Sequence, residues 1–272
     1  MLFNLHRLVL LLGFIWLALT PLRAFDLDTS LGPQALQGFE ALQQHNDREA
    51  FKDFKRAHEN GNVLGTTLLG IAYMEGRGTK VDYYLAKTYF DSALRILKTW
   101  REGSGIGNMA SSLTPLQSST ALLVANYGLA TMMQQGLGMP KDPKQALKMY
   151  RGIIIQLGAN GVGTVMGTNP ATSPIQDPNA GVLDASDALI DGMMGLVIAL
   201  PFKHVINLKL LHASSFKNPI AKEYTAQTLY QIGVAYKMGI GTGKKRKKAI
   251  KFLEKAVEFG NKEAMQALEG LE

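Results

Sequence analysis

The sequence predicts an all-α solenoid of helix–turn–helix repeats, and three observations support this fold class. One frame recurs three times, in which a helical segment ends at a Gly-x-Gly turn that begins at Gly76, Gly136 or Gly239. Small residues recur at fixed distances from each turn. Large apolar residues flank the small ones at helical spacing. Strands should be negligible in such a fold.

Each copy of the frame has the pattern of two helices joined by a tight turn. Two glycines separated by one residue permit backbone conformations that other residues rarely adopt. A small residue lies six positions before the first glycine and an alanine lies ten positions after it, so the paired helices can approach closely. We therefore expect tight helix contacts at Gly70, Ala130 and Gly233 and at Ala86, Ala146 and Ala249.

Large side chains complete the frame on both helices of each pair. Their spacing relative to the small residues predicts that they lie on the buried faces. In the first helices they are Tyr73, Met133 and Tyr236, and in the second helices they are Phe90, Tyr150 and Leu253.

This spacing resembles the Sel-one-like repeat family, whose members are related to tetratricopeptide repeats. The copy that starts at Leu68, L-L-G-I-A-Y-M-E-G-R-G-T, is the best match, whereas the middle copy has Ala130 in place of the usual glycine. The resemblance implies an α-solenoid that acts as an adaptor or scaffold for other proteins, and bacterial relatives often work in the cell envelope or in host interaction. It covers residues 34–100, 119–160 and 219–272.

The first 24 residues have the pattern of a secretory signal. Arg7 gives a short basic start, an apolar run follows over residues 8–19, and Ala24 ends a cleavage region. We expect the mature protein to begin near Phe25, in the periplasm or secreted. An uncleaved N-terminal anchor is the alternative, although the apolar run is shorter than the ~20 residues that a spanning helix needs. No transmembrane helix is expected in the mature chain.

The rest of the chain reads as a linker over residues 25–33 and a repeat domain over residues 34–272. Insertions at 101–118 and 158–218 must separate the repeats. The first is rich in glycine and serine and predicts a loop. The second becomes apolar near Met193–Leu200, a stretch that either packs against the solenoid or receives a membrane surface or a partner.

No residue pattern indicates a catalytic, cofactor-binding or metal-binding site, so we expect no cofactor and no enzymatic activity. There is no cysteine, which excludes thiolate chemistry. The glycines near Gly239 lack the Walker spacing and follow a helix rather than a strand. An acidic group at Asp184, Asp187 and Asp191 permits a divalent site, but helix capping explains the same spacing. The mature histidines are dispersed at His45, His58, His204 and His212.

The sharpest chemical feature is a run of five cations, whose mutual repulsion requires exposure to solvent. The simplest interpretation is the solvated start of a helix. As a functional alternative, we assign these residues as candidate contacts for another protein of acidic character. Binding of an anionic envelope glycan or lipid is an alternative function, and an enzyme with a site built by residues 158–218 is a second. The net charge of +7 does not require nucleic acid, and none is expected. The run consists of Lys244, Lys245, Arg246, Lys247 and Lys248.

Overall fold

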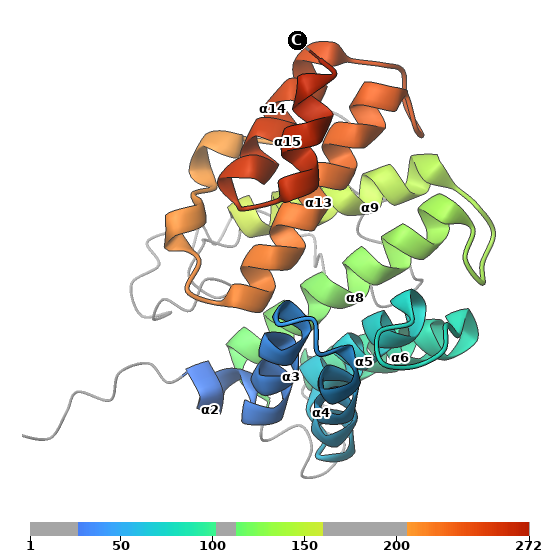
Figure 1. Ribbon diagram of the computed structural model, residues 1–272, viewed down its shortest axis with the longest axis vertical. Coiled ribbons are helices and arrows are strands. Elements are labelled where there is room, and N and C mark those ends of the chain that lie inside the picture. The colour runs from blue at the N-terminus through green and yellow to red at the C-terminus, as the bar shows by residue number, and fades with distance from the viewer. Residues whose placement is uncertain (1–26, 102–112, 160–205, 272) are drawn as a thin grey trace, which may run out of the picture.

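The computed structural model describes residues 27–101, 113–159 and 206–271, and these ranges contain helices but no strand. The helices pack as successive antiparallel pairs that stack into one array (Figure 1), so the predicted all-α solenoid is confirmed. The elements are α2 (Leu27–Leu31), α3 (Pro33–Gln43), α4 (Asp47–Glu59), α5 (Val63–Glu75), α6 (Tyr83–Arg101), α8 (Pro115–Gln135), α9 (Pro143–Ala159), η2 (Leu208–Leu210), η3 (Ala213–Ser215), α13 (Pro219–Met238), α14 (Arg246–Glu258) and α15 (Lys262–Glu269). The recurring frame gives three pairs, which we call the first (α5–α6), second (α8–α9) and third (α13–α14) repeats.

The three repeat turns share one backbone geometry, as the frame predicts. All six glycines of the Gly-x-Gly turns have a positive φ, between 63° and 81°. In each turn the backbone amide six residues after the first glycine donates to the carbonyl three residues before that glycine. These bonds are Asp82 to Tyr73 at 3.0 Å, Asp142 to Met133 at 2.9 Å and Lys245 to Tyr236 at 2.9 Å.

Small residues hold the two helices of a pair in close contact. Ala86, Ala146 and Ala249 are completely buried, which confirms the predicted contacts. A Cβ atom added at Gly70 would lie 2.7 Å from the Phe90 ring, so this glycine makes room for the aromatic side chain of the paired helix.

One large residue departs from the prediction. Tyr73 is only half-buried, whereas Met133 and Tyr236 are buried as expected. The Tyr73 ring stacks on Tyr89 with a centroid distance of 5.6 Å and meets the edge of Phe51 at 5.5 Å. Three rings from α4, α5 and α6 thus shield one another at the rim, and none of them enters the core completely.

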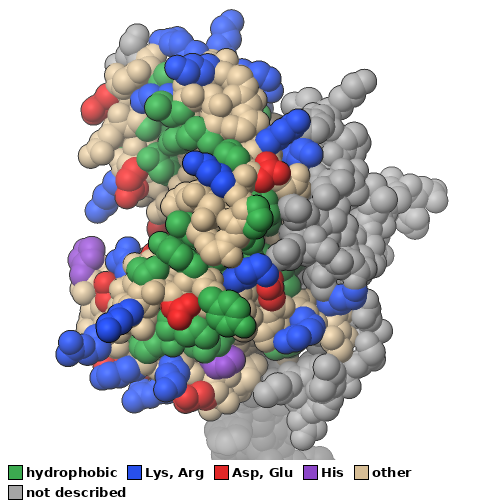
Figure 2. All heavy atoms as spheres, turned by 90° about the vertical axis from the view of Figure 1, so that its right-hand side faces the viewer, with side chains coloured by type: hydrophobic (Ala, Val, Ile, Leu, Met, Phe, Trp, Pro, Cys, Tyr) green, Lys and Arg blue, Asp and Glu red, His purple; other side chains and the backbone are tan. Residues whose placement is uncertain are grey.

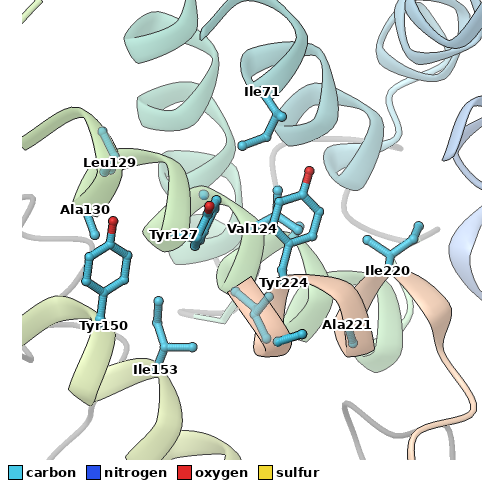
Figure 3. Close-up of a cluster of buried hydrophobic side chains, with 14 of the residues drawn as sticks. Ile71, Val124, Tyr127, Leu129, Ala130, Tyr150, Ile153, Ile220, Ala221 and Tyr224 are labelled. Carbon is cyan, nitrogen blue, oxygen red and sulfur yellow. The ribbon is translucent and has the colours of Figure 1, made fainter. Parts of the chain in front are cut away.

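The repeats are neighbours in space despite the insertions between them. Helix α8 packs on α5 and α6, and α13 packs directly on α8 and α9. Figure 3 shows the junction, where Ile71 of α5 and the rings of Tyr127, Tyr150 and Tyr224 meet. The Tyr127 ring centroid lies 5.3 Å from that of Tyr224 and 6.0 Å from that of Tyr150. The core is therefore continuous across all three repeats.

The ends of both expected insertions are structured. Residues 115–118 of the expected first loop are the first turn of α8, because the Thr114 hydroxyl accepts the Gln117 amide at 3.0 Å and Pro115 fits the first helical position. Residues 206–218 of the second insertion pack on α14, where the Phe216 ring meets the edge of Phe259 at a centroid distance of 4.9 Å. The apolar stretch Met193–Leu200 lies outside the described residues.

The expected linker also contains a helix, α2, which is anchored to two repeats. Leu31 is completely buried, and its carbonyl accepts the side-chain amides of Asn62 at 2.8 Å and Gln117 at 3.3 Å. The first helices of the first and second repeats are therefore bridged by the start of the described chain. Residues 1–24, the predicted signal, lie outside the described residues.

Candidate partner-binding site

The five cations of the basic run lie at the α13–α14 turn and on the first turn of α14, and all five are exposed as predicted. Lys and Arg side chains crowd the upper end of the face drawn in Figure 2, the end that holds α13, α14 and α15. The side chains of the run do not all lie on the same side of the turn. Arg246 donates to the carbonyl of Leu271, whereas Lys245 and Lys248 face the second repeat.

A recess of about 200 Å³ lies between α9 and the third turn, and it brings the basic run together with cations from the second repeat. Lys245 and Lys248 line one side. The side chains that line it include five cations and no carboxylate. Lys244 and Lys247 lie outside it. The three cations on the α9 side are Lys144, Lys148 and Arg151.

These α9 residues were not singled out from the sequence, although a signal for them was present. Lys144, Lys148 and Arg151 are spaced by four and three residues, which places them on one face of a helix. Their proximity to the basic run depends on how the repeats stack. A Cβ atom added at Gly241 would lie 2.2 Å from the Pro143 carbonyl oxygen, so the third turn rests directly on the start of α9.

The recess has an aromatic wall. The Lys248 ammonium lies 5.4 Å from the centroid of the Tyr236 ring. Loss of hydration of the ammonium, and then repulsion from Lys245 and Arg151, lower the pKa of Lys248 below its ordinary value. Lys144, Lys245 and Lys248 form no ion pair with the residues that the structure describes. An incoming anion would relieve this repulsion.

The corresponding junction of the first repeat has mixed charge. There Gly78 rests on the start of α4, as Gly241 rests on the start of α9. Arg77 in that turn pairs with Asp47 at 3.4 Å and with Glu75 at 3.3 Å. The same architecture therefore brings opposite charges together at the first repeat, whereas the charged residues that line the recess at the third are all cations.

The second helices of the three repeats also differ in their N-terminal caps. The Asp82 carboxylate accepts the Leu85 amide at 2.9 Å, and the Asp142 carboxylate accepts the Gln145 amide at 2.9 Å. Lys245 occupies the same position in the third repeat, and no side chain caps α14. The third turn has the same glycine conformations and the same backbone hydrogen bond as the other two turns, but it lacks the capping carboxylate.

We expect Asp142→Ala to lower the free energy of unfolding by about 1 kcal/mol, because it removes the N-terminal cap of α9. Urea denaturation of the full chain measures this change. Asp142→Asn is the matched control and should lose less stability, since its amide oxygen can still accept the Gln145 amide. Equal stability of Asp142→Ala and the wild type would show that this cap contributes nothing.

The described residues offer no metal centre, because no three His, Cys, Asp or Glu side chains among them converge. His58 lies 2.9 Å from the Thr66 hydroxyl and against the edge of Tyr89, within the first repeat. His45 and His212 are exposed and distant in sequence from it. His204, Asp184, Asp187 and Asp191 lie outside the described residues.

The buried tyrosines at the repeat junctions are packing residues. Burial raises the pKa of Tyr127, Tyr150 and Tyr224 above the ordinary value for tyrosine, so these hydroxyls keep their protons at neutral pH. The Tyr150 hydroxyl donates to the Gln134 side chain at 3.0 Å and lies 2.9 Å from the Thr131 hydroxyl. None of the helices in the described ranges has the length and apolar character needed to cross a bilayer.

Comparison with known proteins matches the frame to a described repeat. A family model described as Sel1 repeat matches residues 64–95, 123–151 and 226–261, and each match contains one Gly-x-Gly turn. No curated protein matches the chain. Two solved structures are similar, each with a TM-score of 0.23. A protective antigen of uropathogenic Escherichia coli that displays an SLR fold is 18% identical over 88% of this chain, which spans 56% of that protein. A Sel1 repeat protein from Oxalobacter formigenes is 15% identical over 87% of this chain and 89% of that one.

Proposed function

Because this chain carries three Sel1 repeats, we propose that it is an exported adaptor or scaffold that contacts a partner protein through the basic recess between its second and third repeats. Sel1 repeats generally mediate protein–protein interaction, and the family is typically non-catalytic. The observation that carries the proposal is the convergence of five cations, without a carboxylate, on one recess. Such a site favours an acidic partner.

We expect charged and apolar surface to affect different properties of binding, namely the association rate and the lifetime of the complex. Exposed cations accelerate encounter with an acidic partner, while contacts that exclude water determine how long the complex lasts. The half-buried rings of Phe51, Tyr73 and Tyr89 offer aromatic surface of the kind that is enriched at protein interfaces.

Export is the second part of the proposal, and it rests on the pattern of residues 1–24. A cut after Ala24 leaves α2 and the buried Leu31 in place. We expect N-terminal sequencing of the protein from its native cell to give a start at or near Phe25. Intact Met1 in the soluble cytoplasmic fraction would contradict export, and retention of residues 1–24 in the membrane fraction would indicate an anchor.

The partner is best identified by crosslinking in the native cell. Association of the purified partner with the full chain is then measured across a salt series for the wild type and for a variant with all five cations of the run changed to Gln. We expect slower association and a shallower salt dependence for this variant, with an unchanged circular dichroism spectrum. A matched control carries Gln at five other exposed lysines, namely Lys52, Lys55, Lys80, Lys209 and Lys262.

Equal association rates and equal salt slopes for the two Gln variants would remove the basic run from the interface. Recovery of glycan or anionic lipid without any protein would contradict the adaptor function. That result would instead support an envelope-binding protein, which uses the same cations for a different class of ligand.

A further inference from the structure

Building on the proposed function, we infer that the basic recess holds a carboxylate of an acidic peptide segment, at the position that a capping aspartate occupies in the other two repeats. This assigns to the recess one chemical group and one class of partner.

The three repeat turns place their cap residues in the same backbone setting. The backbone amides of Asp82, Asp142 and Lys245 make the same hydrogen bond within their turns. The carbonyls of these residues also accept the amides of Ala86, Ala146 and Ala249, at 2.9–3.0 Å. The three cap residues therefore align, and they differ in the partner of the amide three residues further on. At Asp82 and Asp142 a carboxylate oxygen lies 2.9 Å from that amide, whereas the Lys248 amide bonds to the Lys245 carbonyl.

The third repeat has no side-chain carboxylate at this cap. The amide of Lys248 corresponds to those of Leu85 and Gln145, and it bonds only to the Lys245 carbonyl, at 2.9 Å. The first turn of α14 contains no acidic residue. A helix N-terminus favours negative charge, so cations at this position are unfavourable until an anion approaches.

Cations of a neighbouring helix surround the start of α14. The first turn of α14 does not stand alone, because Lys144, Lys148 and Arg151 of α9 face it across the recess. A volume of about 200 Å³ admits a group the size of an acidic side chain. Lys144, Lys245 and Lys248 alone carry three positive charges, so a segment with several acidic residues matches the recess better than a single carboxylate does.

A phosphate could satisfy the same charges, but the two aspartates favour a carboxylate. The third turn preserves the backbone that accommodates Asp82 and Asp142, and a planar carboxylate supplied by a partner would meet the same turn. Lys245 and Lys248 would donate to it, and bonds of this charge-assisted kind are stronger than neutral ones.

The test uses the full chain and a fluorescein-labelled, end-blocked peptide of alternating Glu and Gly residues. Affinity is measured for the wild type, for Lys245→Gln/Lys248→Gln, and for Lys244→Gln/Lys247→Gln. The two double variants remove the same charge from the same run, but only the first alters the recess. We expect the first to weaken binding by about tenfold or more and the second by about twofold or less.

Three competing probes fix the chemistry of the ligand. The corresponding Gln–Gly peptide, inorganic phosphate at the concentration of the acidic peptide, and vesicles containing phosphatidylglycerol should each bind at least about tenfold more weakly than the acidic peptide. Tighter binding of phosphate or vesicles would overturn the assignment to a carboxylate, and equal binding of the uncharged peptide would overturn the assignment to an anion.

Equal losses in the two double variants would show that only diffuse charge matters, which would overturn the inference, as would the absence of peptide binding by the wild type. Neither result touches the adaptor function, because a protein partner would still be recovered by crosslinking in the cell. Conversely, the recess could bind the acidic peptide while crosslinking recovers no protein partner. That result would support binding of a carboxylate in the recess and contradict the adaptor function.

Discussion

Phe90→Ala is expected to lower the free energy of unfolding by about 3–5 kcal/mol, the range for removal of a large aromatic side chain from a core. Phe90 is completely buried. Its ring lies against Gly70 of its own repeat and against Gly128 of the second, where an added Cβ atom would be 2.7 Å and 2.3 Å from it. Because both neighbours are glycines, no side chain there can move in to fill the cavity.

Urea denaturation monitored by circular dichroism measures this loss on the full chain. The matched control is Tyr84→Ala in the same helix, because Tyr84 is 79% exposed and its removal should change stability by less than about 0.5 kcal/mol. A loss below about 1 kcal/mol for Phe90→Ala would contradict the close packing of the first repeat on the second.

Gly241→Ala is expected to cost about 2–5 kcal/mol, for two separate reasons. Gly241 has a φ of +67°, a conformation that strains any residue with a side chain. An added Cβ atom would also lie 2.2 Å from the Pro143 carbonyl oxygen, so the third turn would have to move away from α9. The same movement would separate the two sides of the basic recess.

The control for this substitution lies in the same turn. An added Cβ atom at Gly243 meets no atom within 4 Å, and φ there is not positive, so Gly243→Ala should leave stability unchanged or raise it slightly. Thermal and urea denaturation of the two variants give the comparison. Equal stability would mean that the third repeat does not rest on the second in the way described.

The repeat turns and helix pairs were predictable because their signal is local. Gly76 and Ala86 lie ten residues apart, and the same types of residue return at the same spacing at Gly136 and Ala146. A turn that needs positive φ and a helix contact that needs a small residue leave a visible pattern. Tyr73 was assigned to the wrong environment because spacing alone does not show which neighbours reach the rim of the stack.

The residues of the candidate site come from parts of the chain that are far apart in sequence. The sequence therefore indicated the basic run but not the cations of α9. The basic run was visible as a run, whereas Lys144 and Arg151 join it only through the stacking of the repeats across residues 160–205. The helical spacing of the α9 cations was visible, but nothing in the sequence placed α9 beside the third turn. The packing of residues 206–218 on α14 depends in the same way on a distant contact, between Phe216 and Phe259.

The charge at the cap position is a signal that the sequence contains. The frame aligns Asp82, Asp142 and Lys245, so a reversal of charge at a helix cap can be seen in the sequence. The structure gives this reversal its meaning, because it shows that the two aspartates bind first-turn amides. When one position of a repeat is acidic in two copies and basic in the third, that position is a candidate for a function specific to the third copy.

The most direct test of the account is a titration of the alternating Glu–Gly peptide into the full-length Lys245→Asp variant. This substitution restores to the third repeat the cap that the other two possess, and it places a carboxylate of the protein where we expect one from the partner. We expect the affinity for the peptide to fall by at least about tenfold relative to the wild type. An affinity equal to that of the wild type would contradict the account, because the recess would then bind acidic segments without using the cap position of α14.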